Sequence, residues 1–330
     1  MAEDLSPPAH LGTVRTALKA AVGSARIDAI APVPGGASGA FPFRVTVGRR
    51  DYLVRIEGPA SPLRNPHQYV AMSIAAEAGI APRLYYVDEA KRVAVMDFIE
   101  QRPLSTYPGG PRALSQALGR VLRQVQETPS FPGFVEYPDI VARLWEHVCR
   151  TGLFAKGVLD PHSDHLARIR GNCAWDSTQS VSSHNDPVPR NILFDGKRLW
   201  LIDWESAYRN DPLVDVAIML DNFAPSPECE TTLLQTWLGR MPDDTIYPRL
   251  ASIRALTRLY YAGVLLSASA ATLGAIADSD IAVPTDLEFH QAIGQGQRQP
   301  GAPETKHTLG KMYLRSFLHD LKPPGLDAAV

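Results

Sequence analysis

The segment "SHNDPVPRNILFDGKRLWLIDWE", residues 183–205, carries four carboxylates around two short apolar runs. The runs ILF and RLWLID flank Asp195 and Gly196, and an Asp-Gly pair between apolar runs is a strong signal for a β-hairpin. We therefore predict a hairpin, with Asp186 in the loop before it and Asp203 at the end of its second strand. Asp195 is expected to be a turn residue only.

The chain before this segment carries the signals of a small antiparallel sheet. Three apolar runs between Ile27 and Glu57 are separated by glycine-containing turns, which predicts three strands. A helix is expected at 66–78, followed by two more strands in "RLYYVD" and "RVAVMDFI". An amphipathic helix is expected before the sheet, at 9–22. The sheet should therefore have five strands.

The rest of the chain, from Pro111 onward, has mainly helical periodicity. We expect the chain to divide near residue 98, into a first domain at 1–98 and a second at 99–330. Residues 259–277 lack charged side chains but are rich in Ala, Ser and Gly, which favours a buried helix over a membrane span. A polar loop at 295–306 is expected to lead to a last helix at 308–321.

Composition excludes several classes of function. The 330-residue chain has a formal net charge of -2, which gives no electrostatic basis for binding nucleic acid or an anionic membrane. Its three cysteines are an odd number without the spacing of metal ligands, as is typical of a reducing compartment. The acidic, proline-bearing start "MAEDLSPPAH" does not resemble a secretory signal. We expect a cytoplasmic protein.

Four residues in and after the quoted loop point to phosphoryl transfer: His184, Asp186, Asn191 and Asp203. Transfer from ATP requires a carboxylate near the acceptor hydroxyl and oxygen ligands for the magnesium that bridges the phosphates. Asp186 can accept or orient the acceptor proton, while Asn191 and Asp203 can each offer an oxygen to magnesium. His184 is expected to be a supporting, hydrogen-bonded structural residue.

Three stretches, "HNDPVPRNIL", "LIDWESA" and "NDPLVDVA", resemble the motifs of the aminoglycoside phosphotransferase and choline kinase family. Bacterial choline and ethanolamine kinases come closest, and the likeness extends over roughly residues 28–270. The resemblance implies an α+β, protein-kinase-like fold with two lobes. The first would hold the five-stranded antiparallel sheet, and the second would be mainly helical with the catalytic β-hairpin. ATP and Mg²⁺ are the implied cofactors.

The resemblance also implies roles for individual residues. Asp186 would be the catalytic base, and Asn191 and Asp203 would bind magnesium. Asp215, in "VDVA", would brace the catalytic loop by accepting backbone hydrogen bonds. Glu205 would lie near the metal, more in keeping with a structural hydrogen bond than with a ligand.

The same family places its ATP contacts in the first lobe. It has a glycine-rich turn over the phosphates, a cation on the third strand and a linker whose backbone meets adenine. The matching positions are Gly35, Gly36 and Ser38 for the turn, Arg55 for the cation, and the carbonyl of Asp97 and the amide of Ile99 for the linker.

The chain departs from the family pattern at three positions. Gln68 stands where the family has the glutamate that pairs with the strand cation, and Gly39 stands where choline kinases commonly have asparagine. Protein kinases carry a lysine two residues after the catalytic aspartate, and this chain has Val188 there. Phosphorylation of protein serine or threonine is therefore not expected.

The acceptor is expected to be a small-molecule alcohol, choline or ethanolamine first. Choline would need aromatic faces around its ammonium group with an acid nearby. The helical half offers Trp145, Trp237, Phe223, Tyr260, Tyr261 and Asp221, although aromatics at helical spacing are more typical of a core. One alternative is an aminoglycoside-type drug phosphotransferase, and another is a nucleotide-binding protein with little turnover. A two-metal phosphohydrolase is disfavoured because the chain offers too few histidine and carboxylate ligands for two metal ions.

Overall fold

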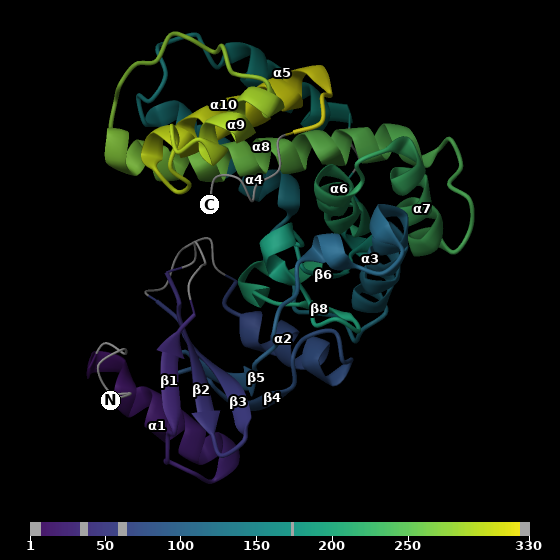
Figure 1. Cartoon of the computed structure of the whole chain (residues 1–330). Helices are drawn as coiled ribbons and strands as arrows, with labels where there is room; N and C mark the ends of the chain where they lie inside the picture. The colour runs from purple at the N-terminus through teal and green to yellow at the C-terminus, as the bar shows by residue number, and fades with distance from the viewer. Residues whose placement is uncertain (1–7, 34–38, 59–64, 173–174, 324–330) are drawn as a thin grey trace.

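The computed structural model describes residues 8–33, 39–58, 65–172 and 175–323. A five-stranded antiparallel sheet forms the first part of the chain and a mainly helical region the rest (Figure 1). The α+β arrangement predicted from the sequence is confirmed.

The sheet has the strand order β1-β2-β3-β5-β4. Its strands are β1 (Ala29–Pro32), β2 (Phe41–Val47), β3 (Arg50–Ile56), β4 (Leu84–Asp88) and β5 (Val93–Asp97). Successive side chains of a strand point to opposite faces. In β3, Val54 packs against α1 (Pro8–Val22), while Leu53 contacts the core of the helical region. Arg55 therefore shares the face of Leu53 and is directed toward the second half of the chain.

A second helix, α2 (Gln68–Glu77), connects the sheet to the helical region. Tyr69 and Met72 are buried in the same core as the helical region, and α2 also contacts the short 3₁₀ helix η5 (Trp204–Ser206). This packing links the sheet to the segment that follows Asp203.

The helical region is organised around its longest helix, α8 (Ile246–Leu273), which packs against α4, α6 and α10. Two glycines allow these close approaches: a Cβ at Gly263 would meet Leu144 of α4 at 2.7 Å, and one at Gly310 of α10 would meet Leu266 at 2.7 Å. The remaining helices are α3 (Gly110–Gln126), α4 (Tyr137–Arg150), α5 (Asp160–Asn172), α6 (Pro212–Phe223), α7 (Pro227–Leu238), α9 (Asp286–Gly294) and α10 (Pro303–His319). Within the described ranges, no helix is long and apolar enough to span a membrane.

Two pairs of short strands carry the central motif. The predicted hairpin is present as β7 (Ile192–Phe194) and β8 (Leu199–Leu201), with Gly196 at φ 95° in its turn. A second pair, β6 (Val181–Ser183) and β9 (Tyr208–Asn210), brackets it. The β6–β9 pair was not predicted, because strands of three residues carry almost no periodicity.

The end of the chain differs from the sequence prediction. The last helix, α10, begins at Pro303 rather than near 308, because proline is well suited to the first helical position and the apolar pattern starts only later. The helix α9 was not predicted, although Thr285 and Glu288 form a capping box at its start.

Candidate active site

The backbone of the loop that follows β6 is hydrogen-bonded to Asp215 of α6. Its carboxylate accepts the backbone N–H groups of His184 and Asn185, each at 2.7 Å. Burial raises the pKa of Asp215 to about 7, although the two N–H donors act in the opposite direction. The Asn185 side chain donates to the carbonyl of Ser206 at 2.9 Å, which ties the loop to the segment after Asp203.

Asp186 lies at the centre of this loop, and both of its carboxylate oxygens have donors. Asn191 donates to Oδ2 at 2.9 Å, and the hydroxyl of Tyr261, on α8, donates to Oδ1 at 2.8 Å. Burial raises the pKa of Asp186 to about 6, while Arg190 and Tyr261 oppose this rise. A carboxylate with a pKa near 6 is mostly ionised at neutral pH and can still accept a proton, which suits a general base.

The backbone of the loop is rigid after Asp186. The N–H of Val188 donates to the carbonyl of Asp186, and the N–H of Asn191 donates to the carbonyl of Val188, both at 2.9 Å. Pro187 and Pro189 restrict φ on either side of Val188. The Val188 side chain is fully buried in the core. The loop therefore positions Asp186 and Asn191 in advance.

Asp203 lies two residues beyond the end of β8, in the left-handed conformation with φ 65°. A non-glycine residue pays about 1 kcal/mol for this conformation, which the surrounding contacts must offset. His184 holds the residues on either side of Asp203. Its ring is hydrogen-bonded to the carbonyl of Ile202 at 2.9 Å and packs against Trp204. Burial lowers the pKa of His184 to about 4, so the ring is neutral and its surroundings are those of a structural residue.

Arg55 reaches from β3 to the second half of the chain. Its guanidinium contacts Asp203 at 2.7 Å, Glu57 at 2.9 Å and Glu205 at 3.7 Å. Burial alone would lower its pKa, but the carboxylates of Asp203 and Glu57 outweigh burial and raise it, so Arg55 stays charged. The same pairing outweighs the effect of burial on Asp203, whose pKa is lowered.

Glu57 is a partner of Arg55 that the sequence analysis missed. The family pattern places this partner in the helix, where the chain has Gln68, which is buried at the start of α2. Glu57 comes two residues after Arg55 and so continues on the same face of the strand. The Arg-x-Glu spacing was the signal that could have identified it.

The oxygen atoms around Asp203 fit a magnesium ion. Asn191 uses its amide nitrogen on Asp186, which leaves its carbonyl oxygen for a cation. Across the described residues, no group of three His, Cys, Asp or Glu side chains forms a ready-made metal cage. Mg²⁺ is usually bound by one or two carboxylates together with substrate phosphates, so a site of this kind suits it.

The nucleotide contacts expected in the sheet are only partly open to description. Gly35, Gly36 and Ser38 lie outside the described residues. The side chain of Asp97 accepts from Arg50 and from the Tyr85 hydroxyl, both at 2.9 Å, so it is engaged within the sheet. The backbone N–H of Ile99 has no hydrogen-bond partner in the described part of the chain, and it is available to a ligand.

The aromatic candidates separate into two groups. Tyr260 and Tyr261 of α8 lie close enough to Asp186 for its charge to raise their pKa values, after the larger effect of burial. Trp145 and Trp237 are engaged elsewhere, through Ser163 and Gln126. Phe223 is a buried core residue, and Asp221 is bound by Arg254 and Arg258, so it is not a free acid for a ligand.

Tyr137 joins the tyrosines near Asp186 and is 1% exposed. Its ring lies 5.8 Å from that of Tyr260 and stacks on Trp175 at 6.4 Å. A cavity of about 10 Å³ lies beside these rings, which is room for about one water molecule. The aromatic side of the site is therefore tightly packed in this conformation.

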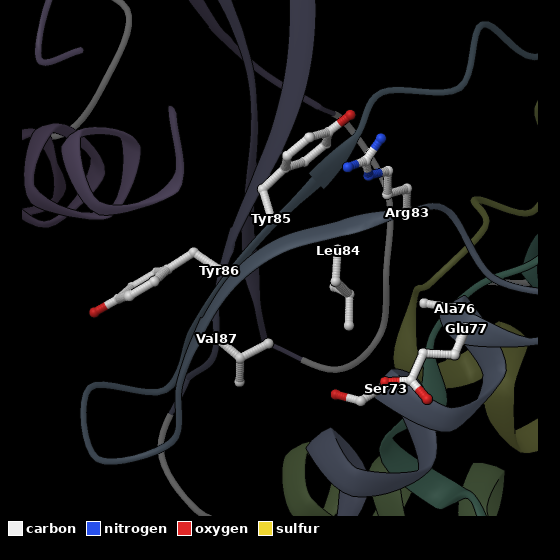
Figure 2. A pocket seen from close by; sticks show the side chains of 8 residues that line it. All are labelled: Ser73, Ala76, Glu77, Arg83, Leu84, Tyr85, Tyr86 and Val87. Carbon is white, nitrogen blue, oxygen red and sulfur yellow. The ribbon is translucent and has the colours of Figure 1, made fainter. Parts of the chain in front are cut away.

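A separate groove of about 570 Å³ lies between α2 and β4 (Figure 2). It is lined by Ser73, Ala76, Glu77 and residues 83–87. None of the residues predicted to act on ATP or the acceptor belongs to this lining. The groove is therefore distinct from the site around Asp186.

Comparison with known proteins also indicates a phosphotransferase. The chain matches the family model of the phosphotransferase enzyme family over residues 29–252. A segment of 57 residues is 44% identical to protein LicA of Haemophilus influenzae, covering 17% of this chain and 21% of that protein. The match thus spans about a fifth of that relative.

Solved structures resemble nearly the whole chain. A choline/ethanolamine kinase family protein from Mesorhizobium loti has 20% identity and a TM-score of 0.63, with coverage of 93% of this chain and 98% of that one. Choline kinase LicA from Streptococcus pneumoniae has 14% identity and a TM-score of 0.63, covering 92% and 98%. Spectinomycin phosphotransferase APH(9)-Ia has 14% identity and a TM-score of 0.55, covering 92% and 93%. The predicted kinase-like fold is confirmed.

Proposed function

Because the chain belongs to the phosphotransferase enzyme family, we propose that it transfers the terminal phosphoryl group of ATP, with Mg²⁺, to the hydroxyl of a small amino alcohol, choline or ethanolamine. The observation that carries this proposal is the position of Asp186. Its carboxylate is aligned by Asn191 and Tyr261, and Asn191 of the same loop is also a proposed magnesium ligand.

In the proposed reaction, Asp186 accepts the proton of the acceptor hydroxyl. The acceptor oxygen forms a bond to the terminal phosphorus while the bond from that phosphorus to the oxygen of ADP breaks. Asp215 keeps the loop in place through the backbone of His184 and Asn185. Arg55 holds Asp203 and contributes positive charge on the ATP side. When bound through Asn191 and Asp203, Mg²⁺ would offset the negative charge of the phosphates.

The proposed division of labour follows the chain. We assign ATP binding to residues 1–98, with Gly35, Gly36, Ser38, Arg55 and the backbone of Asp97 and Ile99, and catalysis with acceptor binding to residues 99–330. A cytoplasmic location suits an enzyme that consumes ATP.

The choice of amino alcohol rests on the tyrosines near Asp186 and on the nature of the relatives. Aromatic faces attract a compact ammonium group, and Tyr137, Tyr260 and Tyr261 bring such faces to the acceptor side of the loop. Two of the similar structures are described as a choline kinase and a choline/ethanolamine kinase family protein. An aminoglycoside, with several positive charges, is the alternative acceptor.

The test is ADP release from the purified protein with MgATP, across choline, ethanolamine, aminoglycosides and simple sugar alcohols. Asp186→Asn should lower turnover by about 10²–10⁴, the usual contribution of a positioned general base. Asp195→Asn is the matched control, because Asp195 accepts hydrogen bonds only within the hairpin and an asparagine oxygen can replace it.

Each outcome has a defined meaning. A response to choline or ethanolamine that is lost in Asp186→Asn and kept in Asp195→Asn supports the proposal. A response to aminoglycosides alone replaces the acceptor. ATP binding without turnover on any acceptor would make the chain a nucleotide-binding protein.

A further inference from the structure

Arg190 is a cation of the catalytic loop that the assignments above leave without a role. It belongs to the short helix η4 (Pro189–Asn191), directly before the proposed magnesium ligand Asn191. Its guanidinium lies 3.3 Å from Oδ2 of Asp186, and its side chain is 29% exposed. Asn191 donates to the same oxygen at 2.9 Å, so the contact of Arg190 is the looser of the two.

The guanidinium of Arg190 lies beside the proposed base, at 3.3 Å from Oδ2 of Asp186, and its backbone directly precedes the proposed metal ligand Asn191. It therefore borders the space between the proposed base and the proposed metal ligands. A terminal phosphoryl group would have to occupy that space to meet both the proposed base and the proposed metal ligand.

The other arginine of the site is not equivalent. Arg55 is surrounded by Asp203, Glu57 and Glu205, so much of its charge is balanced by protein carboxylates. In the loop itself, residues 183–192, Arg190 is the only lysine or arginine. Val188 cannot offer a polar contact, because it is fully buried in the core.

We propose that Arg190 is a catalytic residue that binds the terminal phosphoryl group of ATP during its transfer. This inference rests on the proposed phosphotransferase reaction. A phosphoryl group in transfer carries its charge on three equatorial oxygens, which a planar guanidinium can bind through two parallel N–H groups. When Arg190 turns to the phosphate, Oδ2 of Asp186 keeps the amide of Asn191 as its donor.

The position of Arg190 makes this movement small. Its backbone is fixed between Pro189 and Asn191, so only the side chain has to turn. A looser contact at 3.3 Å to Asp186 is exchanged for a doubly charged phosphate. Donors directed at developing charge are among the largest single contributions to catalysis.

The first test is binding, which does not require turnover. We expect Arg190→Ala to weaken a non-hydrolysable MgATP analogue about tenfold or more, because hydrogen bonds to charged groups contribute strongly, and to leave MgADP affinity nearly unchanged. Titration calorimetry measures both. Equal affinities of Arg190→Ala and the parent for the ATP analogue would overturn the inference, even if no acceptor were ever found.

The second test is kinetic, with the acceptor that the panel identifies. Arg190→Ala should lower kcat by about 10²–10³, Arg190→Lys should lower it less, and added guanidinium should restore part of the activity of Arg190→Ala. Arg209→Ala, at an exposed position of β9, is the matched control and should retain parental kcat. Loss of kcat in Arg190→Ala with a lowered Tm, no guanidinium rescue and unchanged analogue binding would show a structural role instead. If the parent itself turns over no acceptor, the proposed function fails while the binding test still decides the inference.

Discussion

Two clusters of arginine and carboxylate groups in this molecule differ in the group that lies at their centre. In the candidate site, the guanidinium of Arg55 contacts three carboxylates: Glu57, Asp203 and Glu205. Between α6 and α8, the carboxylate of Asp221 contacts the guanidiniums of Arg254 and Arg258, which in turn reach Glu230 and Asp320.

The two arrangements suit different roles: a ligand site around Arg55 and a structural ion-pair cluster around Asp221. The cluster at Asp221 satisfies its buried acid completely, and Arg258 extends it to Asp320 at the end of α10 at 2.8 Å. In the cluster at Arg55, the carboxylates of Asp203 and Glu205 are still partly exposed, at 19% and 26% of the side chain. Accessible carboxylate oxygens are the ligands that Mg²⁺ binds together with substrate phosphates. The accessibility of the carboxylates therefore distinguishes the two clusters.

The largest effect on stability is expected from Asp221→Asn. The change removes the negative charge opposite the guanidinium of Arg258, which is 3% exposed, and sets an NH₂ group against one of its donors; breaking a buried ion pair costs about 3–5 kcal/mol. Denaturant unfolding should show this loss, while the Mg²⁺ concentration for half-maximal activity stays the same in the folded protein. A change in Mg²⁺ dependence would link this cluster to the active site.

Asp203→Asn should have the opposite profile. Arg55 keeps Glu57 and Glu205 as partners, so the free energy of unfolding should change less than in Asp221→Asn. The Mg²⁺ concentration for half-maximal activity should rise by about 10–100-fold, because even neighbours of a metal ligand contribute that much. Activity measured over a Mg²⁺ series would show this, and an unchanged Mg²⁺ dependence would exclude Asp203 as a ligand.

The raised pKa of Asp186 predicts the acid limb of the activity profile. The ionised form is required to take the proton, and with a pKa of about 6 half of the carboxylates are ionised at pH 6. Below that pH, kcat/KM should fall about tenfold for each unit. A profile that stays flat down to pH 4 would mean that the carboxylate is not the proton acceptor.

Tyr261→Phe tests the contact from α8 and should have the smallest effect. The change removes the hydroxyl that donates to Oδ1 of Asp186 at 2.8 Å, and this donor lowers the pKa of the carboxylate. We expect the acid limb to move to higher pH and kcat/KM to fall about tenfold, as for loss of a hydrogen bond to a charged group. Tyr247→Phe, at an exposed position of α8, is the control.

The sheet and the hairpin were predictable because their signals are local. Alternating apolar residues and glycine turns indicated all five strands, and Asp195-Gly196 indicated the β7–β8 turn. The short strands β6 and β9 were not predictable, because they pair across 24 intervening residues and each has only three. Their pairing depends on the fold around them and not on their own sequences.

The candidate site divides in the same way. His184, Asp186 and Asn191 come from one loop, so their spacing alone suggested that they act together. Tyr261 approaches Asp186 across 75 residues of sequence, and the sequence offered it only as one of several aromatic candidates. The sequence offered Asp221 as an acid near the acceptor, but in the structure Asp221 forms ion pairs with Arg254 and Arg258.

The sequence by itself determined the five strands of the sheet, the hairpin and the residues of the catalytic loop, because turn chemistry and side-chain period act over a few residues. Only the tertiary structure decided how the charges are paired: Arg55 with Glu57, Asp203 and Glu205, and Asp221 with its two arginines. These pairs form across separate elements, and their geometry depends on how the helices pack against each other and the sheet. A sequence states which charges a chain carries, but the packing of its elements decides which of them remain available to a ligand.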